Sequence, residues 1–232
     1  MIILGLDTTT RSGSAAVLRD GDVLSELSGD ATLAHGQRLP GDLDRALDAA
    51  GVTIDDVALL AVVAGPGSFT GMRIGIAAMQ GVAFSRGLTV VAVSALEAIG
   101  RLTLRTAGDG ALVAVWIDAQ RGEVFATVYD GSVGRPLAAP SSATPAATLE
   151  SWRGALASRP VEFAGDGAVR YKDVIVQALG ERATVREPAP TLAAEAARIA
   201  AEHPERAVAP HGIAPIYVRR PDVVLARGRS SR

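Results

Sequence analysis

The stretch AGPGSFTGMRIG, residues 64–75, holds the residue types best suited to binding an anion. It places four glycines within eleven residues, directly after the apolar run LLAVVA at 59–64. A strand followed by a glycine-rich turn and a helix N-terminus presents backbone N–H groups and the positive end of the helix dipole to an anion such as phosphate. The alternative is a tight turn whose glycines allow positive φ or close packing. Both remain open at this point.

The known phosphate-binding motifs do not match this loop. Gly-Lys-Ser/Thr is missing, and no glycine stands at the sixth place of a G-x-G-x-x-G pattern. Lys172 is the only lysine beside 22 arginines, so a phosphate-binding lysine has almost nowhere to be. The run DTTT at 7–10 ends the first predicted strand and resembles the Asp-and-Thr phosphate turn of sugar kinases, with a polar hairpin turn as the alternative. The residues nearest a nucleotide would be Asp7, Thr8, Gly65, Pro66, Gly67, Ser68, Phe69 and Thr70.

Few other residues are placed for catalysis. The three histidines, His35, His203 and His211, are too scattered for a usual zinc site, and no H-x-x-x-H or H-E-x-x-H pattern occurs. No G-x-S-x-G elbow is present, which leaves a serine hydrolase unsupported. Asp118 in WIDAQRGEVF ends a predicted strand, where a phosphotransferase base would lie. A hairpin in which Arg121 pairs with a nearby carboxylate is the alternative.

Composition favours a globular protein. The 232 residues are 48% hydrophobic and 21% charged, which is enough to bury a core and leaves room for two lobes. The net charge of −2 gives no overall attraction to nucleic acid. No run approaches a membrane span of about 18 apolar residues, and the N-terminus lacks the features of a signal peptide. With no cysteine, the chain fits a reducing compartment. We expect a cytoplasmic protein without membrane contact.

The same order of elements occurs twice along the chain. The first half predicts strands at 2–7, 14–19 and 22–28, a helix at 37–50, a strand at 59–64, a helix at 71–86, a strand at 88–93 and a helix opened by a capping box at Ser94. The second half predicts a hairpin at 112–130, a helix at 144–158, a strand at 161–165 and helices at 168–179 and 191–203. This duplicated βββαβα order indicates an α/β, two-lobed actin-like or sugar-kinase-like (ASKHA) fold. We expect lobes at 1–107 and 108–218 and a flexible arginine-rich tail at 219–232, with a weak electrostatic contact to RNA as the alternative for this tail.

The helix at 71–86 is apolar nearly all round, which is typical of a helix covered on more than one side. Gly71, Gly75, Ala78, Gly81 and Ser85 follow one another at helical spacing. Because an interior helical glycine costs roughly 1 kcal/mol relative to alanine, such a stripe indicates close approach of another backbone. Periodicity leaves open whether that backbone belongs to the chain's own sheet or to a partner.

The segments LGLDTTT, GPGSFTGMRIG, IDAQRGEVF and PIYVRRPDV together resemble the TsaB (YeaZ) family, the bacterial partner in making threonylcarbamoyladenosine on tRNA. The resemblance runs from residue 2 to about residue 223. Of these segments, G-P-G-S-F-T-G-x-R-I-G is highly specific to that family. The resemblance implies the same two-lobed actin-like fold as the doubled order.

The family is described as lacking catalytic machinery of its own. It pairs with TsaD, a metal-binding homologue that transfers the threonylcarbamoyl group to N6 of the adenosine just 3′ of the anticodon, and the ATPase TsaE joins the pair. The resemblance therefore implies a non-catalytic activator subunit that binds no cofactor itself and meets tRNA only through the complex. It leaves open whether ATP or ADP sits at the subunit junction.

In that family, the helix after the glycine loop and the preceding long helix contact TsaD and form a small helical bundle. These would be 71–86 and 37–50 here, and we expect the same face to form a homodimer when the chain is alone. The implied interface residues are Leu39, Leu43, Ala46, Leu47, Gly71, Arg73, Ile74, Gly75, Ala78, Gly81, Val82 and Ser85. One departure concerns the start of helix 37–50, where Pro40 comes one place earlier than in the family pattern after His35.

Two enzyme hypotheses stand beside this interpretation. An ATP-dependent small-molecule phosphotransferase would use Asp7 and the loop at 65–71 on ATP, with Asp118 as base, and the lack of lysine counts against it. A metal-dependent glycopeptidase would need a histidine pair that the sequence does not contain.

Overall fold

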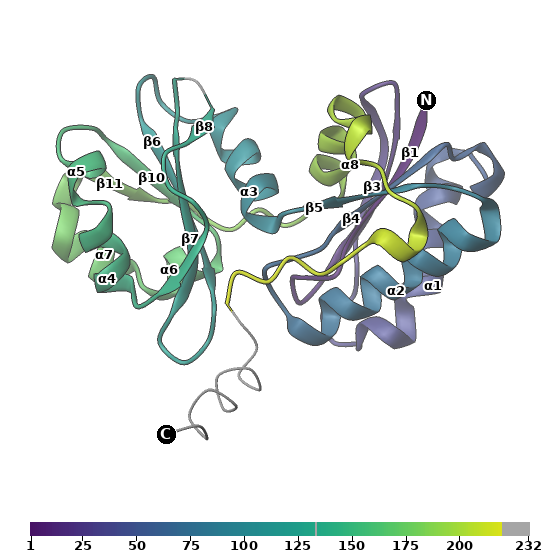
Figure 1. Ribbon diagram of the computed structural model, residues 1–232, viewed down its shortest axis with the longest axis horizontal. Helices are drawn as coiled ribbons and strands as arrows, with labels where there is room; N and C mark the ends of the chain where they lie inside the picture. The colour runs from purple at the N-terminus through teal and green to yellow at the C-terminus, as the bar shows by residue number, and fades with distance from the viewer. Residues whose placement is uncertain (133, 220–232) are drawn as a thin grey trace.

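The computed structural model describes residues 1–132 and 134–219, which form two α/β lobes side by side (Figure 1). The predicted arginine-rich tail lies outside the described residues except for Arg219. In the first lobe, one sheet has the strand order β3-β2-β1-β4-β5. These strands are β1 (Ile2–Asp7), β2 (Ser14–Arg19), β3 (Asp22–Ser28), β4 (Leu59–Val63) and β5 (Val90–Val93). The first three run antiparallel, and β4 and β5 continue the sheet parallel to β1.

Helices cover both faces of this sheet. α1 (His35–Ala50) and α2 (Phe69–Arg86) pack on one face, and α8 (Ala193–Glu202) packs on β1, β2 and β4 from the other. The short helix η1 (Ile54–Asp56) precedes β4. Since strands alternate their side chains between faces, Leu4 and Leu6 face α1 and α2, whereas Ile3 faces α8.

The second lobe repeats the topology with a six-stranded sheet of order β11-β10-β6-β7-β8, to which β9 adds on β7. Its strands are β6 (Leu112–Asp118), β7 (Val124–Asp130), β8 (Arg135–Pro136), β9 (Ser141–Ala143), β10 (Val161–Ala164) and β11 (Ala183–Val185). Its helices are α4 (Pro145–Ser151), α5 (Arg153–Leu156), α6 (Asp166–Arg170), α7 (Lys172–Leu179) and η2 (Gly180–Arg182). Trp116 fills its core against Trp152 and Phe163. The predicted two-lobed actin-like fold is confirmed.

A shared core joins the lobes along one side. α3 (Ala95–Leu104) lies between the two sheets, and α8 packs beside it (Figure 1). One continuous apolar cluster contains Val63 of the first sheet, Ile199 of α8 and Val115 of the second sheet. Backbones approach closely there, because a Cβ at Gly5 of β1 would lie 2.3 Å from the Ala193 carbonyl oxygen. This packing corrects the predicted boundary: α8 was assigned to the lobe at 108–218 but buries its apolar face on the first sheet.

The ends of the helices follow local signals. Ser68 caps α2 by accepting a hydrogen bond from the Gly71 amide at 3.2 Å, and Gly87, with φ of 65°, ends the helix. α1 begins at His35, two residues before the predicted start, and contains Pro40. Ser94 precedes α3 without a side-chain capping bond, so the predicted capping box is wrong. The predicted helix at 168–179 is two helices, α6 and α7.

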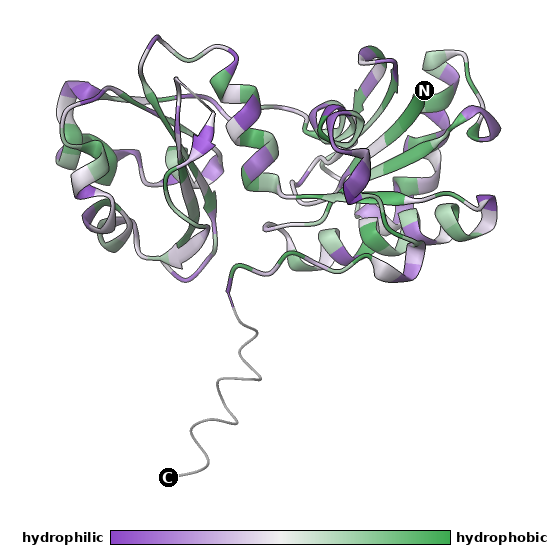
Figure 2. Ribbon diagram, turned by 45° about the horizontal axis from the view of Figure 1, so that its top comes forward, coloured by the Kyte–Doolittle hydropathy of each residue, from purple (hydrophilic) through white to green (hydrophobic). Residues whose placement is uncertain are grey.

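Figure 2 shows apolar residues concentrated on the strands and on the helix faces turned toward them. After α8 the chain passes through η3 (Pro204–Arg206) and η4 (Pro210–Gly212) and returns along the first lobe. There Val208 bridges to Val90 at the free edge of β5. Within residues 1–132 and 134–219, no helix combines the length and the apolar character needed to cross a membrane.

Candidate functional site

The turn after β1 satisfies its own carboxylate. Asp7 is 1% exposed, and one of its oxygens accepts hydrogen bonds from the Thr9 amide at 2.7 Å and the Thr9 hydroxyl at 2.6 Å. The other oxygen accepts from the Thr10 hydroxyl at 2.8 Å. Thr8 donates its hydroxyl to the Gly71 carbonyl of α2 at 2.8 Å. The threonine hydroxyls that could bind phosphate therefore already have protein partners.

The glycine loop packs against neighbouring backbone. Ser68 donates its amide to the Thr9 carbonyl at 2.9 Å, and a Cβ on Gly67 would lie 2.7 Å from the Thr9 Cβ. Gly65 has φ of +115°, and a Cβ there would lie 2.9 Å from the Ile216 carbonyl oxygen. These glycines are needed where two other segments of the chain come close. Of the two alternatives raised by the sequence, close packing is observed.

Between the lobes lies a cleft of about 1340 Å³. The turn at 9–12, the segment 31–35 and the glycine loop form the wall on the first lobe. Residues 117–120 and 165–166 form the wall on the second lobe, and residues 216–219 also line the cleft. Asp118 in this wall accepts hydrogen bonds from Arg170 at 2.6 Å and from the Gln120 side chain at 3.0 Å. Its carboxylate is thus paired within the lobe, with Arg170.

At the tip of the β6–β7 hairpin, a second acidic side chain, Glu123, contacts the segment that ends the described chain. Glu123 accepts hydrogen bonds from Ser142 at 2.7 Å and from Arg219 at 3.2 Å. The Ser142 hydrogen bond, followed by the charges of Arg219 and Arg121, lowers the pKa of Glu123. Its ionised form is therefore favoured in the folded protein.

His35 links the start of α1 to the first turn. Arg38 donates to its Nδ1 at 2.8 Å, so Nε2 carries the proton and donates to the Thr10 carbonyl at 3.0 Å. His203 pairs instead with Glu205, in the segment after α8. In the part of the chain that the structure describes, no group of three or more His, Cys, Asp or Glu side chains could hold a metal ion.

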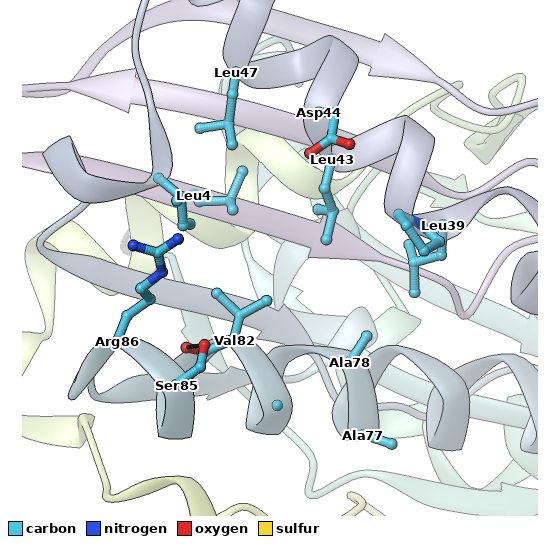
Figure 3. A pocket seen from close by; sticks show the side chains of 13 residues that line it. Leu4, Leu39, Leu43, Asp44, Leu47, Ala77, Ala78, Val82, Ser85 and Arg86 are labelled. Atoms are coloured by element: carbon cyan, nitrogen blue, oxygen red, sulfur yellow. Dashed lines mark hydrogen bonds between the residues drawn. The ribbon is translucent and has the colours of Figure 1, made fainter.

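A mainly apolar groove runs between α1 and α2, and we call it the α1–α2 groove. Its volume is about 490 Å³. In Figure 3, Leu39, Leu43 and Leu47 of α1 lie along one side, with Ala78 and Val82 of α2 opposite. The complete lining is Leu4, Leu39, Pro40, Leu43, Asp44, Leu47, Ile54, Ala77, Ala78, Gly81, Val82, Ser85 and Arg86. The groove brings together seven of the twelve predicted interface residues: Leu39, Leu43, Leu47, Ala78, Gly81, Val82 and Ser85.

The glycine stripe of α2 divides into two environments. A Cβ on Gly71 would lie 2.0 Å from the Thr8 carbonyl oxygen, and one on Gly75 would lie 2.1 Å from the Thr8 hydroxyl oxygen. Both glycines are buried against the chain's own first turn, which corrects their predicted place on an open face. At Gly81, by contrast, a Cβ would meet nothing within 4 Å. Only the C-terminal half of the stripe is open to a partner.

The other predicted interface residues lie outside the groove. Ala46 of α1 is fully buried in the core of the first lobe, which corrects its predicted place at a partner interface. Ile74 is partly buried in the core beside the sheet. Arg73 is exposed on another side of α2, where its guanidinium lies 3.9 Å from the centre of the Phe69 ring.

Sequence reasoning missed several features of this face. Leu4, Pro40, Asp44, Ile54, Ala77 and Arg86 also line the groove. Phe84, one turn after Gly81, is 84% exposed and is the most exposed large apolar side chain among the described residues. A phenylalanine in a nearly uniformly apolar helix gives no periodic signal of the side it faces.

Comparisons with known proteins agree with the geometry. The protein-family model described as "TsaD: tRNA N6-adenosine threonylcarbamoyltransferase" matches residues 29–219. The tRNA threonylcarbamoyladenosine biosynthesis protein TsaB of Bacillus subtilis (strain 168) is 30% identical over 229 residues, 94% of each chain. TsaB of Escherichia coli (strain K12) is 36% identical over 129 residues, 56% of this chain and 55% of that protein.

A solved structure matches the whole fold. The crystal structure of a Pseudomonas aeruginosa protein, described as uncharacterized with similarity to peptidase YEAZ, superposes with a TM-score of 0.78. Its sequence is 30% identical, and the match covers 94% of this chain and 99% of that one.

Proposed function

Because the chain belongs to the TsaB (YeaZ) family of tRNA threonylcarbamoyladenosine biosynthesis proteins, we propose that it is the non-catalytic partner that activates a TsaD threonylcarbamoyltransferase. TsaD would transfer the threonylcarbamoyl group to tRNA, and this chain would hold TsaD in its active state through the α1–α2 groove. The observation that carries the proposal is this groove, an apolar face that no described segment of the chain covers.

The groove has the properties of a helix-docking surface. Apolar side chains dominate its lining, and Ala78 and Gly81 leave the backbone of α2 accessible. Small residues at helical spacing allow a second helix to approach closely, and neighbouring leucines supply apolar area. Phe84 adds a side chain whose burial is worth about 1.5–3 kcal/mol. A helix pair of the partner laid into the groove would complete a small helical bundle.

The internal hydrogen bonds of the cleft support a non-catalytic role. In the phosphotransferase hypothesis, Asp7 would act on the phosphates and Asp118 would act as the base. Asp7 instead accepts three hydrogen bonds from its own turn, and Asp118 is paired with Arg170. A general base needs a free lone pair within reach of the substrate proton. Turnover of ATP by the isolated chain would revive this second hypothesis.

The remaining partners follow from the same proposal. The isolated chain forms a homodimer through the α1–α2 groove, and TsaD replaces the second copy. The ATPase TsaE joins the pair, and tRNA is met only through the complex. The chain binds no cofactor by itself and works in the cytoplasm.

The test is a charged side chain placed in the groove. Gly81→Arg introduces it at an exposed position where a new Cβ meets nothing within 4 Å, so we expect the monomer to keep its fold. Asp173→Arg, at an exposed position of α7 in the second lobe, is the matched control. Light scattering after size exclusion, with TsaD from the same organism, reports pairing, and a reconstituted reaction reports tRNA modification.

We expect Gly81→Arg to lose both the homodimer and the TsaD heterodimer, and the control to keep them. A folded Gly81→Arg chain that still pairs with TsaD would move the interface elsewhere. A TsaD reaction that runs unchanged without this chain would refute the activator role.

A further inference from the structure

The segment that follows η4 runs from the first lobe to the second (Figure 1). The chain is anchored to α2 where Gln80 donates to the Pro210 carbonyl at 3.0 Å, and Ile213 is buried in the first-lobe core. Ile216 then donates its amide to the Ala64 carbonyl at 2.8 Å, directly before the glycine loop. Three residues later, Arg219 reaches Glu123 of the second lobe at 3.2 Å.

The side chains of this segment alternate as in an extended strand. Ile216 packs against the core between the first sheet and α2, and Val218 packs against the core that the two lobes share. Tyr217 points the other way, 6.2 Å from the Phe69 ring centre in a stacked arrangement. Arg219 places its guanidinium 5.8 Å from the centre of the Phe125 ring. Each residue from 216 to 219 thus has a defined contact, and the contacts divide between the lobes.

The glycine loop is shaped to receive this segment. Any side chain at Gly65 would meet the Ile216 carbonyl oxygen at 2.9 Å and the Met72 sulfur at 2.6 Å. The neighbours of the loop are Thr9 on one side and Ile216 of this segment on the other. The segment that packs against the glycine loop is therefore part of the same chain.

The segment is a second connection between the lobes, which borders the cleft and touches the shared core only through Val218. α3, α8 and the shared core join the lobes on one side, while residues 216–219 border the cleft. We propose that residues 213–219 form a latch across the cleft: while it is bound, the lobes keep one angle, and when 216–219 detach, the lobes rotate apart about α3 and α8.

The latch is built to open before the lobes unfold. Among the described residues, the latch meets the second lobe through the Arg219–Glu123 ion pair, whose side chains are 30% and 33% exposed, through the contact of Arg219 with the Phe125 ring, and through the partly buried Val218. Partly exposed ion pairs contribute little and weaken with salt. The latch also contacts α2, because Arg73 donates to the Tyr217 hydroxyl at 3.1 and 3.3 Å. Through Tyr217, the latch thereby links the angle between the lobes to the N-terminal part of α2.

The experiment measures a distance between the lobes in the chain alone. The sequence contains no cysteine, so Asp22→Cys on β3 and Asp173→Cys on α7 provide the only two sites for spin labels, both exposed. Pulsed electron paramagnetic resonance then reads the distribution of label distances. Excess unlabelled chain keeps the signal intramolecular if the protein self-associates.

Two chain lengths form a matched pair. A chain ending at Arg219 keeps the latch, whereas a chain ending at Pro215 lacks residues 216–219 of the latch and keeps Ile213. In the full chain, Tyr217→Ser with Arg219→Glu removes the outward contacts without cutting the backbone, and adding Glu123→Arg restores an ion pair of opposite polarity.

We expect a narrow distribution for the full chain and for the chain ending at Arg219. Removal of the latch, or the double substitution, should give about ten-fold more of a longer-distance population, the effect of losing an ion pair and an aromatic contact. Adding Glu123→Arg should reverse part of this change. Folded variants that keep the distribution of the full chain would overturn the latch. Because TsaD is absent from this measurement, such a result would leave the docking proposal untouched.

Discussion

Gly75 and Gly81 lie on the same helix, and the same substitution to alanine should have opposite effects at the two positions. Gly75 is buried, and a Cβ there would lie 2.1 Å from the Thr8 hydroxyl oxygen and 3.3 Å from the Thr8 Cβ. Gly81 is exposed, and a Cβ there would meet nothing within 4 Å. Neither glycine has positive φ, so each alanine is compatible with the helical backbone.

The magnitudes follow from these contacts. An alanine in place of an interior helical glycine gains about 1 kcal/mol, and at Gly81 nothing opposes this gain. At Gly75 the new methyl group displaces Thr8, which is 1% exposed and cannot turn toward solvent. Overpacking costs about 1–3 kcal/mol, and the hydrogen bond from Thr8 to the Gly71 carbonyl, worth about 1 kcal/mol, is lost. We expect Gly75→Ala to destabilise the fold by about 1–3 kcal/mol after the helical gain.

Urea unfolding followed by circular dichroism measures both effects. For a chain of this size, each 1 kcal/mol corresponds to about 2–4 °C in Tm. Ala78→Gly, on the same helix, is the control and should lose about 1 kcal/mol. Measurements at several protein concentrations separate the stability of the monomer from self-association. Gly75→Ala as stable as the wild type, or Gly81→Ala less stable, would refute our assignment of the two glycines.

Three further substitutions probe the shared core and its buried ionisable groups. Gly5→Ala would bring a methyl group within 2.3 Å of the Ala193 carbonyl oxygen, so we expect a loss of about 3 kcal/mol or more by urea unfolding, and wild-type stability would contradict the close approach of α8 to β1. Burial raises the pKa of Tyr129 to about 12, so the fold favours the neutral form and stability should fall as pH rises from 10 to 12. In urea titrations Tyr129→Phe should lack this loss of stability, and an equal loss in both proteins would contradict the prediction. Burial also raises the pKa of Glu195 above its ordinary 4.5, despite the charge of Arg105, so ionisation of Glu195 works against folding. As pH rises from 4.5 to 7, Glu195→Gln should therefore become more stable relative to the wild type. A difference in unfolding free energy between the two proteins that stays constant with pH would contradict this.

Much of the fold could be predicted because its signals are local. Alternating or continuous apolar runs identified β1 to β7 and β10, helical spacing identified α1, α2 and α8, and their repeated order indicated two lobes. The motif GPGSFTGMRIG led to the family. The strands β8, β9 and β11 were missed because each has only two or three residues, too few to show any period.

The candidate site was predicted only in part. Helical spacing shows which residues share one side of a helix, but it does not show whether that side faces the protein's own core or solvent. It grouped Gly71, Gly75 and Gly81 on one stripe, and five of the twelve predicted interface residues lie outside the α1–α2 groove. The first half of α2 packs against the turn after β1, and the second half is open beside α1. The leucines of α1 do share one side of the groove, because their 3–4 residue spacing defines one apolar face over four turns.

By itself, the sequence determined which elements form, in what order, and which family they belong to, since these depend on residues close together in the chain. Only the tertiary structure decided what each element touches. It turned the Asp7 carboxylate toward its own threonines, returned α8 to the first sheet, and placed Ile216 against the glycine loop some 150 residues earlier in the chain. Contacts between residues so far apart in the chain depend on how whole layers pack. The hydrophobic effect that drives this packing is non-directional, so the spacing of nearby residues does not show which distant segments meet.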